Sequence, residues 1–370
     1  MGKKDFRFYD SRQKYLLFVT TTNEKNKISD SIYPYIKKIK PQQPALKIFD
    51  AGLGDGSLLM NVIRQCHKEF PEIPFLVSSK EISMEDVRLS LEKLSDRFVE
   101  HKRLVFVVSN LHYSEAANLT SSNIKKQRKI NWNVVKLKGH TSLEFNSQLT
   151  KINKILEKNW KVERSPKSGN PTYKEPSVLI LYREDQEFIL NDIIPTKKNP
   201  KNSFDLIIAS QPYRSRIALK KKIEYVIKPM IDSLQTNGNL LIIHACGNDP
   251  ASKIISKIWP KEKPFPTLSK DLINFLNKNF DKKLLEKLKI HSVKKLRYSL
   301  RALPNELSNG ISTSLVFSAW NAATYVNQMD DIKIAEVERK NLYQKVTQDV
   351  VKKNNGLWFN DELLVISKKK

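Results

Sequence analysis

The stretch KIFDAGLGDGSLL, residues 47–59, constrains the fold of this 370-residue chain more than any other feature. A short apolar run leads directly into a loop with glycine at 52, 54 and 56, and the residues after the loop carry apolar side chains at helical spacing. A strand that turns through glycines into a helix is typical of α/β proteins. The stretch predicts a strand at about 46–49, a helix from about Ser57, and a loop after Asp50 whose backbone can approach a ligand closely.

The alternation of strand and helix continues along the chain. Apolar runs without polar interruption, as expected of buried parallel strands, recur at about 75–79, 103–110, 203–210 and 239–247. Two further strands are expected at about 293–302 and 357–367. The chain is therefore predicted to form an α/β fold with a doubly wound, mostly parallel sheet of seven strands.

The spacing of the strands divides the chain into four segments. We expect an N-terminal helical lid (1–44), the first half of the sheet (45–113), an inserted α+β subdomain between the third and fourth strands (114–202), and the second half of the sheet (203–370). The inserted subdomain is expected to contain a hairpin at 177–194, and the second half a helical insertion near 303–356. The lid is expected to place three features over the ligand: Tyr9, Lys14 and the Thr20–Thr22 cluster.

The chain is strongly basic, with a formal net charge of +26. Lysine outnumbers arginine 51 to 14, and the lysines are spread over the whole sequence. Surfaces that read phosphates and bases usually favour arginine for its two-pronged hydrogen bonding. The charge thus favours a solvated basic surface, and a dedicated nucleic-acid face remains the alternative.

Other classes of protein are disfavoured by composition. Two cysteines are too few for a disulfide scaffold, and no cysteine–histidine cluster has the spacing of a metal site. No apolar run is long enough to cross a bilayer, and the first ten residues lack the apolar core of a signal peptide. We expect a cytoplasmic protein without a metal or a membrane partner; the oligomeric state stays open.

Polar residues follow the predicted strands where a ligand would lie. Ligands of open α/β sheets bind beyond the carboxyl ends of the strands. The candidate binding residues there are Asp50, Gly52, Gly54, Gly56, Glu81, Ser109 and Asn110, and the candidate catalytic residues are Ser210, Gln211, Tyr213 and His244.

The spacing of the glycines excludes two common phosphate-binding loops. A dinucleotide fold requires G-x-G-x-x-G, but here Gly56 comes one place too early and Ser57 stands at the third glycine position. A phosphate loop requires G-x-x-x-x-G-K-[ST], and no lysine follows at that distance. The loop therefore serves a different ligand or only makes a tight turn.

The order of these features resembles class I S-adenosylmethionine-dependent methyltransferases over residues 45–113 and 203–247. The resemblance implies that S-adenosylmethionine is the cofactor, and that the loop of Asp50 and the three glycines lies against its methionine and ribose. It also implies that Glu81 binds the ribose hydroxyls and that Ser109 or Asn110 lies near the adenine.

The sequence SQPY at 210–213 resembles the [Asp/Asn/Ser]-x-Pro-[Tyr/Phe] element of methyltransferases that act on amino nitrogens. That resemblance implies that Ser210 and a backbone carbonyl hold the nitrogen while Tyr213 packs beside the substrate. Gln211 departs from the proline found in many members. His244, which follows the fifth strand, is a candidate acceptor for the substrate's proton because a neutral imidazole is available near pH 7.

These features leave three functions open. The first is methyl transfer to a nitrogen of a small-molecule amine or heterocycle. The second is methyl transfer to an amino group of an RNA or DNA base. The third is a non-catalytic module that binds the cofactor, with Gln211 marking lost activity.

Overall fold

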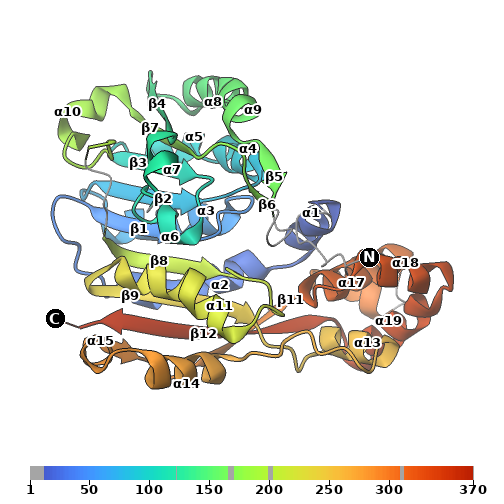
Figure 1. Cartoon of the computed structure of the whole chain (residues 1–370). Coiled ribbons are helices and arrows are strands. Elements are labelled where there is room, and N and C mark those ends of the chain that lie inside the picture. Colours follow the sequence, from blue (N-terminus) through green and yellow to red (C-terminus); the bar gives the residue numbers. More distant parts are fainter. Residues whose placement is uncertain (1–11, 122, 166–170, 199–202, 309–311, 370) are drawn as a thin grey trace.

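A computed structural model describes residues 12–121, 123–165, 171–198, 203–308 and 312–369. Figure 1 shows one continuous twisted sheet with helices packed on both faces and a further group of helices, α1, α13 and α17–α19, at one end of the strands. The structure is a mixed α/β fold with a mostly parallel central sheet, as predicted.

Ten described strands form the main sheet, in the order β10-β12-β9-β8-β1-β2-β3-β7-β4, and β11 pairs with β12 beside β10. The five central strands, β9, β8, β1, β2 and β3, run parallel to one another, and β12 runs antiparallel to β9. The strand bounds are β1 Leu46–Asp50, β2 Phe75–Lys80, β3 Leu104–Ser109, β4 Asn131–Leu137, β5 Val162–Arg164, β6 Pro171–Tyr173, β7 Ser177–Arg183, β8 Phe204–Ser210, β9 Leu234–Ala245, β10 Leu288–Ile290, β11 Lys294–Ser299 and β12 Trp358–Lys368.

The prediction of seven strands is wrong, because the segment 114–202 extends the main sheet. Strand β7 pairs antiparallel with β3, and β4 pairs with β7, so both add to the edge where a seven-stranded sheet would end. The predicted hairpin at 177–194 is also wrong: only its first arm is a strand, and the residues after Arg183 form the 3-10 turn η1 and helix α10. A separate small sheet, β5 with β6, completes the inserted segment.

Three clusters of buried apolar side chains surround the sheet. One face packs against α2–α5, α8 and α9, and the opposite face packs against α6, η2, α12 and α14. The third cluster joins α1, α13 and α17–α19 beyond the strand ends.

The first helices are α1 Arg12–Thr21, α2 Glu24–Ile36, α3 Ser57–Glu69, α4 Met84–Glu92, α5 Ser95–Glu100, α6 Tyr113–Ala116, α7 Ile124–Arg128, α8 Ser142–Lys151, α9 Asn153–Asn159, η1 Glu184–Gln186 and α10 Glu187–Leu190. The remaining helices are α11 Leu219–Lys222, the π-turn η2 Ile223–Ile227, α12 Lys228–Asp232, α13 Pro250–Ile258, α14 Ser269–Asn279, α15 Lys282–Glu286, α16 Pro304–Ser308, α17 Thr313–Val326, α18 Asp331–Arg339 and α19 Leu342–Lys353. None of the helices in the described ranges is both long and apolar enough to span a membrane.

The strand order reverses next to β1. The chain runs from β1 outward to β2 and β3, and then returns to the other side of β1 to form β8 and β9. The loops that follow β1 and β8 leave in opposite directions and open a crevice at the carboxyl edge of the sheet. This switch point is where open α/β sheets bind their ligands.

Candidate active site

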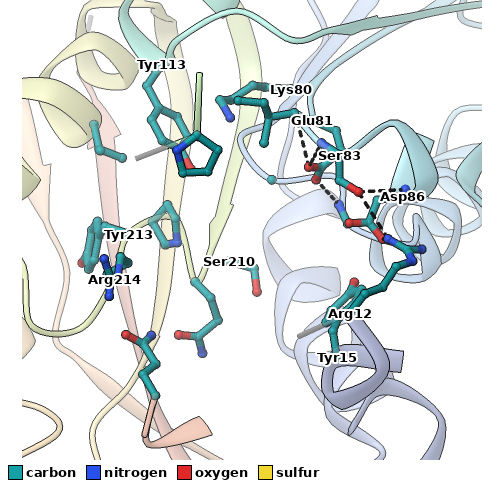
Figure 2. Close-up of a pocket in the computed structure, with 18 of the residues that line it drawn as sticks. Arg12, Tyr15, Lys80, Glu81, Ser83, Asp86, Tyr113, Ser210, Tyr213 and Arg214 are labelled. Atoms are coloured by element: carbon teal, nitrogen blue, oxygen red, sulfur yellow. Dashed lines mark hydrogen bonds and ion pairs between the residues drawn. The ribbon is translucent and has the colours of Figure 1, made fainter. Parts of the chain in front are cut away.

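A cavity of about 600 Å³ lies at this carboxyl edge. Figure 2 shows it between Glu81 and Asp86 on one side and Tyr113 and Tyr213 on the other, with Ser210 in between. The structure brings most of the predicted residues together here. The predicted residues that line the cavity are Gly52, Gly54, Glu81, Asn110, Ser210, Gln211 and Tyr213.

The glycine loop owes its shape to two residues in the left-handed region. Gly54 has φ +53° and Gly56 has φ +79°, which residues with a Cβ rarely adopt. A Cβ at Gly56 would lie 2.7 Å from Ser90 Oγ, and one at Gly54 would overlap the Tyr15 hydroxyl. Gly52 differs from both, because its added Cβ would meet only the Ser210 carbonyl oxygen, 3.7 Å away. Gly52 is therefore the glycine that keeps the cavity open, whereas Gly56 lies outside the cavity lining and shapes the loop.

Asp50 lies behind this loop and is completely buried. Its Oδ1 accepts a hydrogen bond from the Gly52 N–H at 3.0 Å, whereas Oδ2 has no hydrogen-bond partner among the described residues. Burial raises the pKa of this carboxyl group to about 6, and the charge of Lys25 opposes that rise. Asp50 thus leaves one acceptor unsatisfied next to the loop that would hold a ligand.

Glu81 follows β2 and faces the same loop. Its Oε2 accepts the Gly54 N–H at 2.9 Å, and its Oε1 accepts the N–H groups of Ile82 and Ser83 at 2.8 and 2.9 Å. These bonds fix the carboxylate at the cavity wall (Figure 2). A fixed carboxylate at this place suits a pair of hydroxyl donors.

Ser109 and Asn110 differ in what they can offer a ligand. The Asn110 amide donates to the carbonyl oxygens of Asn159 and Glu175 and accepts the Ser177 N–H. These three bonds tie β3 to the inserted segment, so the amide is fully used within the protein. Ser109 is buried, and its Oγ has no hydrogen-bond partner among the described residues.

Helix α1 covers the glycine loop through residues that the sequence analysis missed. Arg12 donates to Asp86 Oδ1 at 3.0 Å and to Ser83 Oγ at 3.2 Å, and the Tyr15 hydroxyl accepts the Asp55 N–H at 2.9 Å (Figure 2). Burial and the nearby Glu81 raise the pKa of Asp86 to about 6. The Asp86 carboxylate, to which Arg12 donates, therefore loses its charge in mildly acidic solution.

The lid residues predicted from sequence do not line the cavity. Lys14 forms an ion pair with Asp331, Thr20 and Thr21 bond to carbonyl oxygens of α1, and Thr22 pairs with Leu300. Tyr9 lies outside the described residues.

Ser210 and Gln211 end β8 with different roles. Ser210 lines the cavity, and its buried Oγ has no hydrogen-bond partner among the described residues. Gln211 adopts a left-handed conformation, φ +49°, and its amide donates to Asp361 Oδ2 and accepts the Ala245 N–H, both at 3.2 Å. Gln211 thus joins three strand ends, and its strained backbone marks a position fixed by its surroundings.

Tyr213 and His244 form a hydrogen-bonded pair behind the cavity wall. The Tyr213 hydroxyl lies 2.7 Å from His244 Nδ1, and His244 Nε2 lies 3.1 Å from Ser269 Oγ and 3.4 Å from Glu362 Oε2. Burial and Glu362 raise the pKa of Tyr213, so its hydroxyl stays protonated. His244 itself does not line the cavity, and it acts on the site only through Tyr213.

One part of the cavity combines aromatic rings with acidic groups. Phe18 and Tyr325 lie with ring centres 4.9 Å apart, and Tyr298 and Glu24 line the same cavity. Asp361 is buried behind Gln211, and burial together with the nearby Glu24 holds its pKa well above the usual range. Rings beside carboxyl groups suit a cationic or protonatable nitrogen.

No group of three or more metal-ligating side chains occurs among the residues that the structure describes. The side chains that line the cavity carry carboxyl, hydroxyl, amide, aromatic and cationic groups.

Comparison with known proteins gives distant structural similarities only. No protein-family model and no curated protein sequence matches the chain. Among solved structures, a putative class I S-adenosylmethionine-dependent methyltransferase from Listeria monocytogenes is 10% identical, with 93% of this chain and 60% of that chain covered and a TM-score of 0.32. The present chain thus spans less than two thirds of that protein.

Two further matches are methyltransferases. Precorrin-6y C5,15-methyltransferase from Geobacter metallireducens is 8% identical, with 92% and 88% of the two chains covered and a TM-score of 0.34. Geranyl diphosphate methyltransferase, solved with GPP and sinefungin, is 11% identical, with 92% and 78% covered and a TM-score of 0.34. These values are too low to assign an activity.

Proposed function

We propose that the chain is a class I S-adenosylmethionine-dependent methyltransferase that methylates a nitrogen of a small-molecule amine or heterocycle. The observation that carries the proposal is that the glycine loop and the Glu81 carboxylate line one cavity at the switch point of the sheet, with the half-satisfied Asp50 carboxyl buried behind the loop. Loop spacing had already excluded dinucleotide and phosphate loops.

The residues present fit this cofactor. Glu81 offers fixed acceptors for a ribose diol, and Gly52 leaves room for close approach. The Asp50 carboxyl, buried behind the loop with Oδ2 unpaired, favours a cationic group such as an α-ammonium in front of the loop. Asn110 lines the cavity and supports its wall through the side-chain amide, whereas Ser109 is buried outside the cavity lining. The cavity volume lies within the range of ordinary ligand sites and leaves space for a small acceptor.

The cofactor supplies a sulfonium methyl that is already activated for displacement. The chain's own task is to align the acceptor nitrogen and exclude water, which gives rate without strong acid–base chemistry. Ser210 Oγ, at the middle of the cavity, accepts a hydrogen from the nitrogen, and Tyr213 provides a ring held in place by His244.

The acidic and aromatic part of the cavity supports a nitrogen acceptor. A nitrogen must lose its proton to present a lone pair. The candidate acceptor for that proton is the Glu24 carboxylate in the cavity wall, whose Oε2 lies 2.9 Å from Lys25 Nζ in an ion pair. His244 is less suited to this role than the sequence suggested, because both of its ring nitrogens are engaged behind Tyr213.

The test uses methyl-labelled cofactor with fractionated cell extract. We expect label in the small-molecule fraction with the wild-type protein, and about a hundredfold less with Tyr213→Ala, because an acceptor that is no longer positioned reacts slowly. The control is Tyr225→Ala, which changes a tyrosine that is 62% exposed on η2. Label found in RNA, DNA or protein and absent from small molecules would overturn the proposed substrate class.

A further inference from the structure

Lys80, the last residue of β2, is a buried lysine without an anionic partner. Only 8% of its surface is exposed, and it lines the cavity. Its ammonium nitrogen makes no hydrogen bond or ion pair among the described residues, and it lies 4.7 Å from the centre of the Tyr113 ring. The neighbouring Glu81 carboxylate is already held by three backbone N–H groups. An unpaired buried charge is costly unless a ligand completes it.

Tyr113 adds a second donor at the same place. It is the first residue of α6, it lines the cavity, and its hydroxyl makes no hydrogen bond among the described residues. Burial raises the pKa of this hydroxyl, so it stays a donor at neutral pH. Figure 2 shows Lys80 and Tyr113 adjacent at one end of the cavity, away from Arg12 and Tyr15.

This pair lies on the face of the sheet opposite to Asp50. Side chains alternate along a strand, so Lys80 points to the same face as Leu76, which packs with the cluster of η2 and α12. Tyr113 and Tyr213 pack against that cluster too. By the same alternation Asp50 shares the face of Ile48, which belongs to the cluster of α2 and α3. Lys80 therefore enters the cavity from the face of the sheet opposite to Asp50.

We propose that Lys80 and Tyr113 form a subsite for an anionic group, a carboxylate or a phosphate, on the methyl acceptor. The inference rests on the proposed function and makes it more specific. An acceptor with a nitrogen near Ser210 and Glu24 and an anionic group near Lys80 is an amino acid-like or phosphate-bearing amine. Such a molecule matches a cavity in which aromatic rings and the Glu24–Lys25 ion pair lie in one part and the unpaired Lys80 lies in another.

The test is calorimetric titration of inorganic phosphate and of acetate into the full-length protein, with and without saturating S-adenosylhomocysteine. We expect one of the two anions to bind, and its identity distinguishes phosphate from carboxylate. Lys80→Met should weaken that binding by about tenfold or more, as for the loss of a hydrogen bond to a charged group. Lys80→Arg should change it by less than about threefold, and Tyr113→Phe should weaken it by about two- to fivefold. The matched control, Lys353→Met, removes an exposed lysine from α19 and should have no effect.

Two results would overturn the inference: neither anion binds to the wild-type protein, or binding is the same in Lys80→Met as in the wild type. Circular dichroism of Lys80→Met checks that the fold is retained. The titration of S-adenosylhomocysteine reports separately on the proposed function. If S-adenosylhomocysteine binds but anion binding does not depend on Lys80, the subsite proposal is rejected and the methyltransferase proposal stands. If S-adenosylhomocysteine does not bind to the wild type, the methyltransferase proposal is rejected.

Discussion

At the scale of single residues, the three glycines of the loop have separable roles. Gly52→Ala adds a methyl group in ordinary contact distance of one carbonyl oxygen, so we expect the free energy of unfolding to change by less than about 0.5 kcal/mol. The same methyl group narrows the cavity, so the affinity for S-adenosylhomocysteine should fall. Gly56→Ala forces a left-handed residue against Ser90, and we expect a loss of about 2–4 kcal/mol of stability.

Urea unfolding and calorimetric titration of both variants measure these two effects. A Gly52→Ala protein that binds the cofactor as well as the wild type would contradict the placement of Gly52 in the cavity wall.

The buried carboxyl group of Asp50 makes a prediction about pH. Its pKa is raised from 3.8 to about 6, so the folded state binds a proton more tightly than the unfolded state. Ionisation of Asp50 therefore lowers the stability of the wild type as the pH rises from about 4 to 6, and the full loss persists above pH 6. Asn at this position keeps an acceptor for Gly52 without the charge. Asp50→Asn should be more stable than the wild type by about 1–3 kcal/mol above about pH 6, with little difference near pH 4.

Urea unfolding of the wild type and Asp50→Asn across this pH range provides the measurement. The same substitution should weaken cofactor binding, because Oδ2 no longer carries a negative charge. A variant that is less stable than the wild type at neutral pH would contradict this account of Asp50.

Local sequence patterns predicted those cavity residues that lie at the end of a strand or directly after it. Glu81, Ser210 and Gln211 follow continuous apolar runs, and the carboxyl ends of parallel strands meet at one edge. The roles of Gln211 and Asn110 could not be read in this way, because their partners Asp361 and Glu175 are distant in sequence. For the same reason the isolation of Lys80 is visible only in three dimensions.

At the scale of elements, α1 covers the end of the cavity beside the glycine loop, where we propose that the cofactor binds. It is held there by Arg12, whose partner Asp86 ionises at about pH 6. Arg12→Gln should raise the dissociation rate of S-adenosylhomocysteine by about three- to tenfold at pH 7–8 and cost about 1 kcal/mol or less of stability, because the pair is partly exposed. In the wild type the rate should rise as the pH falls below about 6, where Asp86 takes up a proton, and in Arg12→Gln that dependence should be lost.

Stopped-flow measurement of dissociation provides the test. The matched control is Lys14→Gln. Lys14 lies on α1 like Arg12, and its substitution breaks the ion pair with Asp331 of α18 but leaves the cavity lining unchanged. Equal dissociation rates for wild type and Arg12→Gln would show that α1 does not act as a lid.

The elements of the inserted segment explain why the hairpin predicted at 177–194 was wrong. The apolar run of β7 reads correctly as a strand, but the residues after it carry both polar and apolar side chains, and they form η1 and α10. A short alternating stretch fits a strand and a helix almost equally well. The pairing of β7 with β3 joins residues that lie 69 to 75 positions apart in sequence, and no local pattern encodes such a tertiary contact.

At the scale of the whole molecule, the inserted segment is part of one sheet, and Asn110 connects it to the cofactor half. Asn110→Ala leaves the Ser177 N–H without its acceptor and leaves two carbonyl oxygens to share the Ser177 hydroxyl, so we expect a loss of about 2–4 kcal/mol. Because the sheet is continuous, unfolding should remain a single transition at a lower urea midpoint.

Tryptophan fluorescence and circular dichroism both follow the urea unfolding transition. The fluorescence includes the inserted segment, because Trp132 and Trp160 lie there. The control is Asn133→Ala, which removes only contacts within that segment. Two separated transitions, of which only one shifts, would mean that the inserted segment folds on its own.

The central claim is that the cavity at the carboxyl edge of the sheet binds S-adenosylmethionine through the glycine loop and Glu81. The most direct measurement is calorimetric titration of S-adenosylhomocysteine into the wild type and Glu81→Gln. We predict one site per chain in the wild type and an affinity about tenfold or more lower in Glu81→Gln, since a charged acceptor of the ribose hydroxyls is lost. Absence of binding to the wild type, or equal affinity in the two proteins, would contradict the claim.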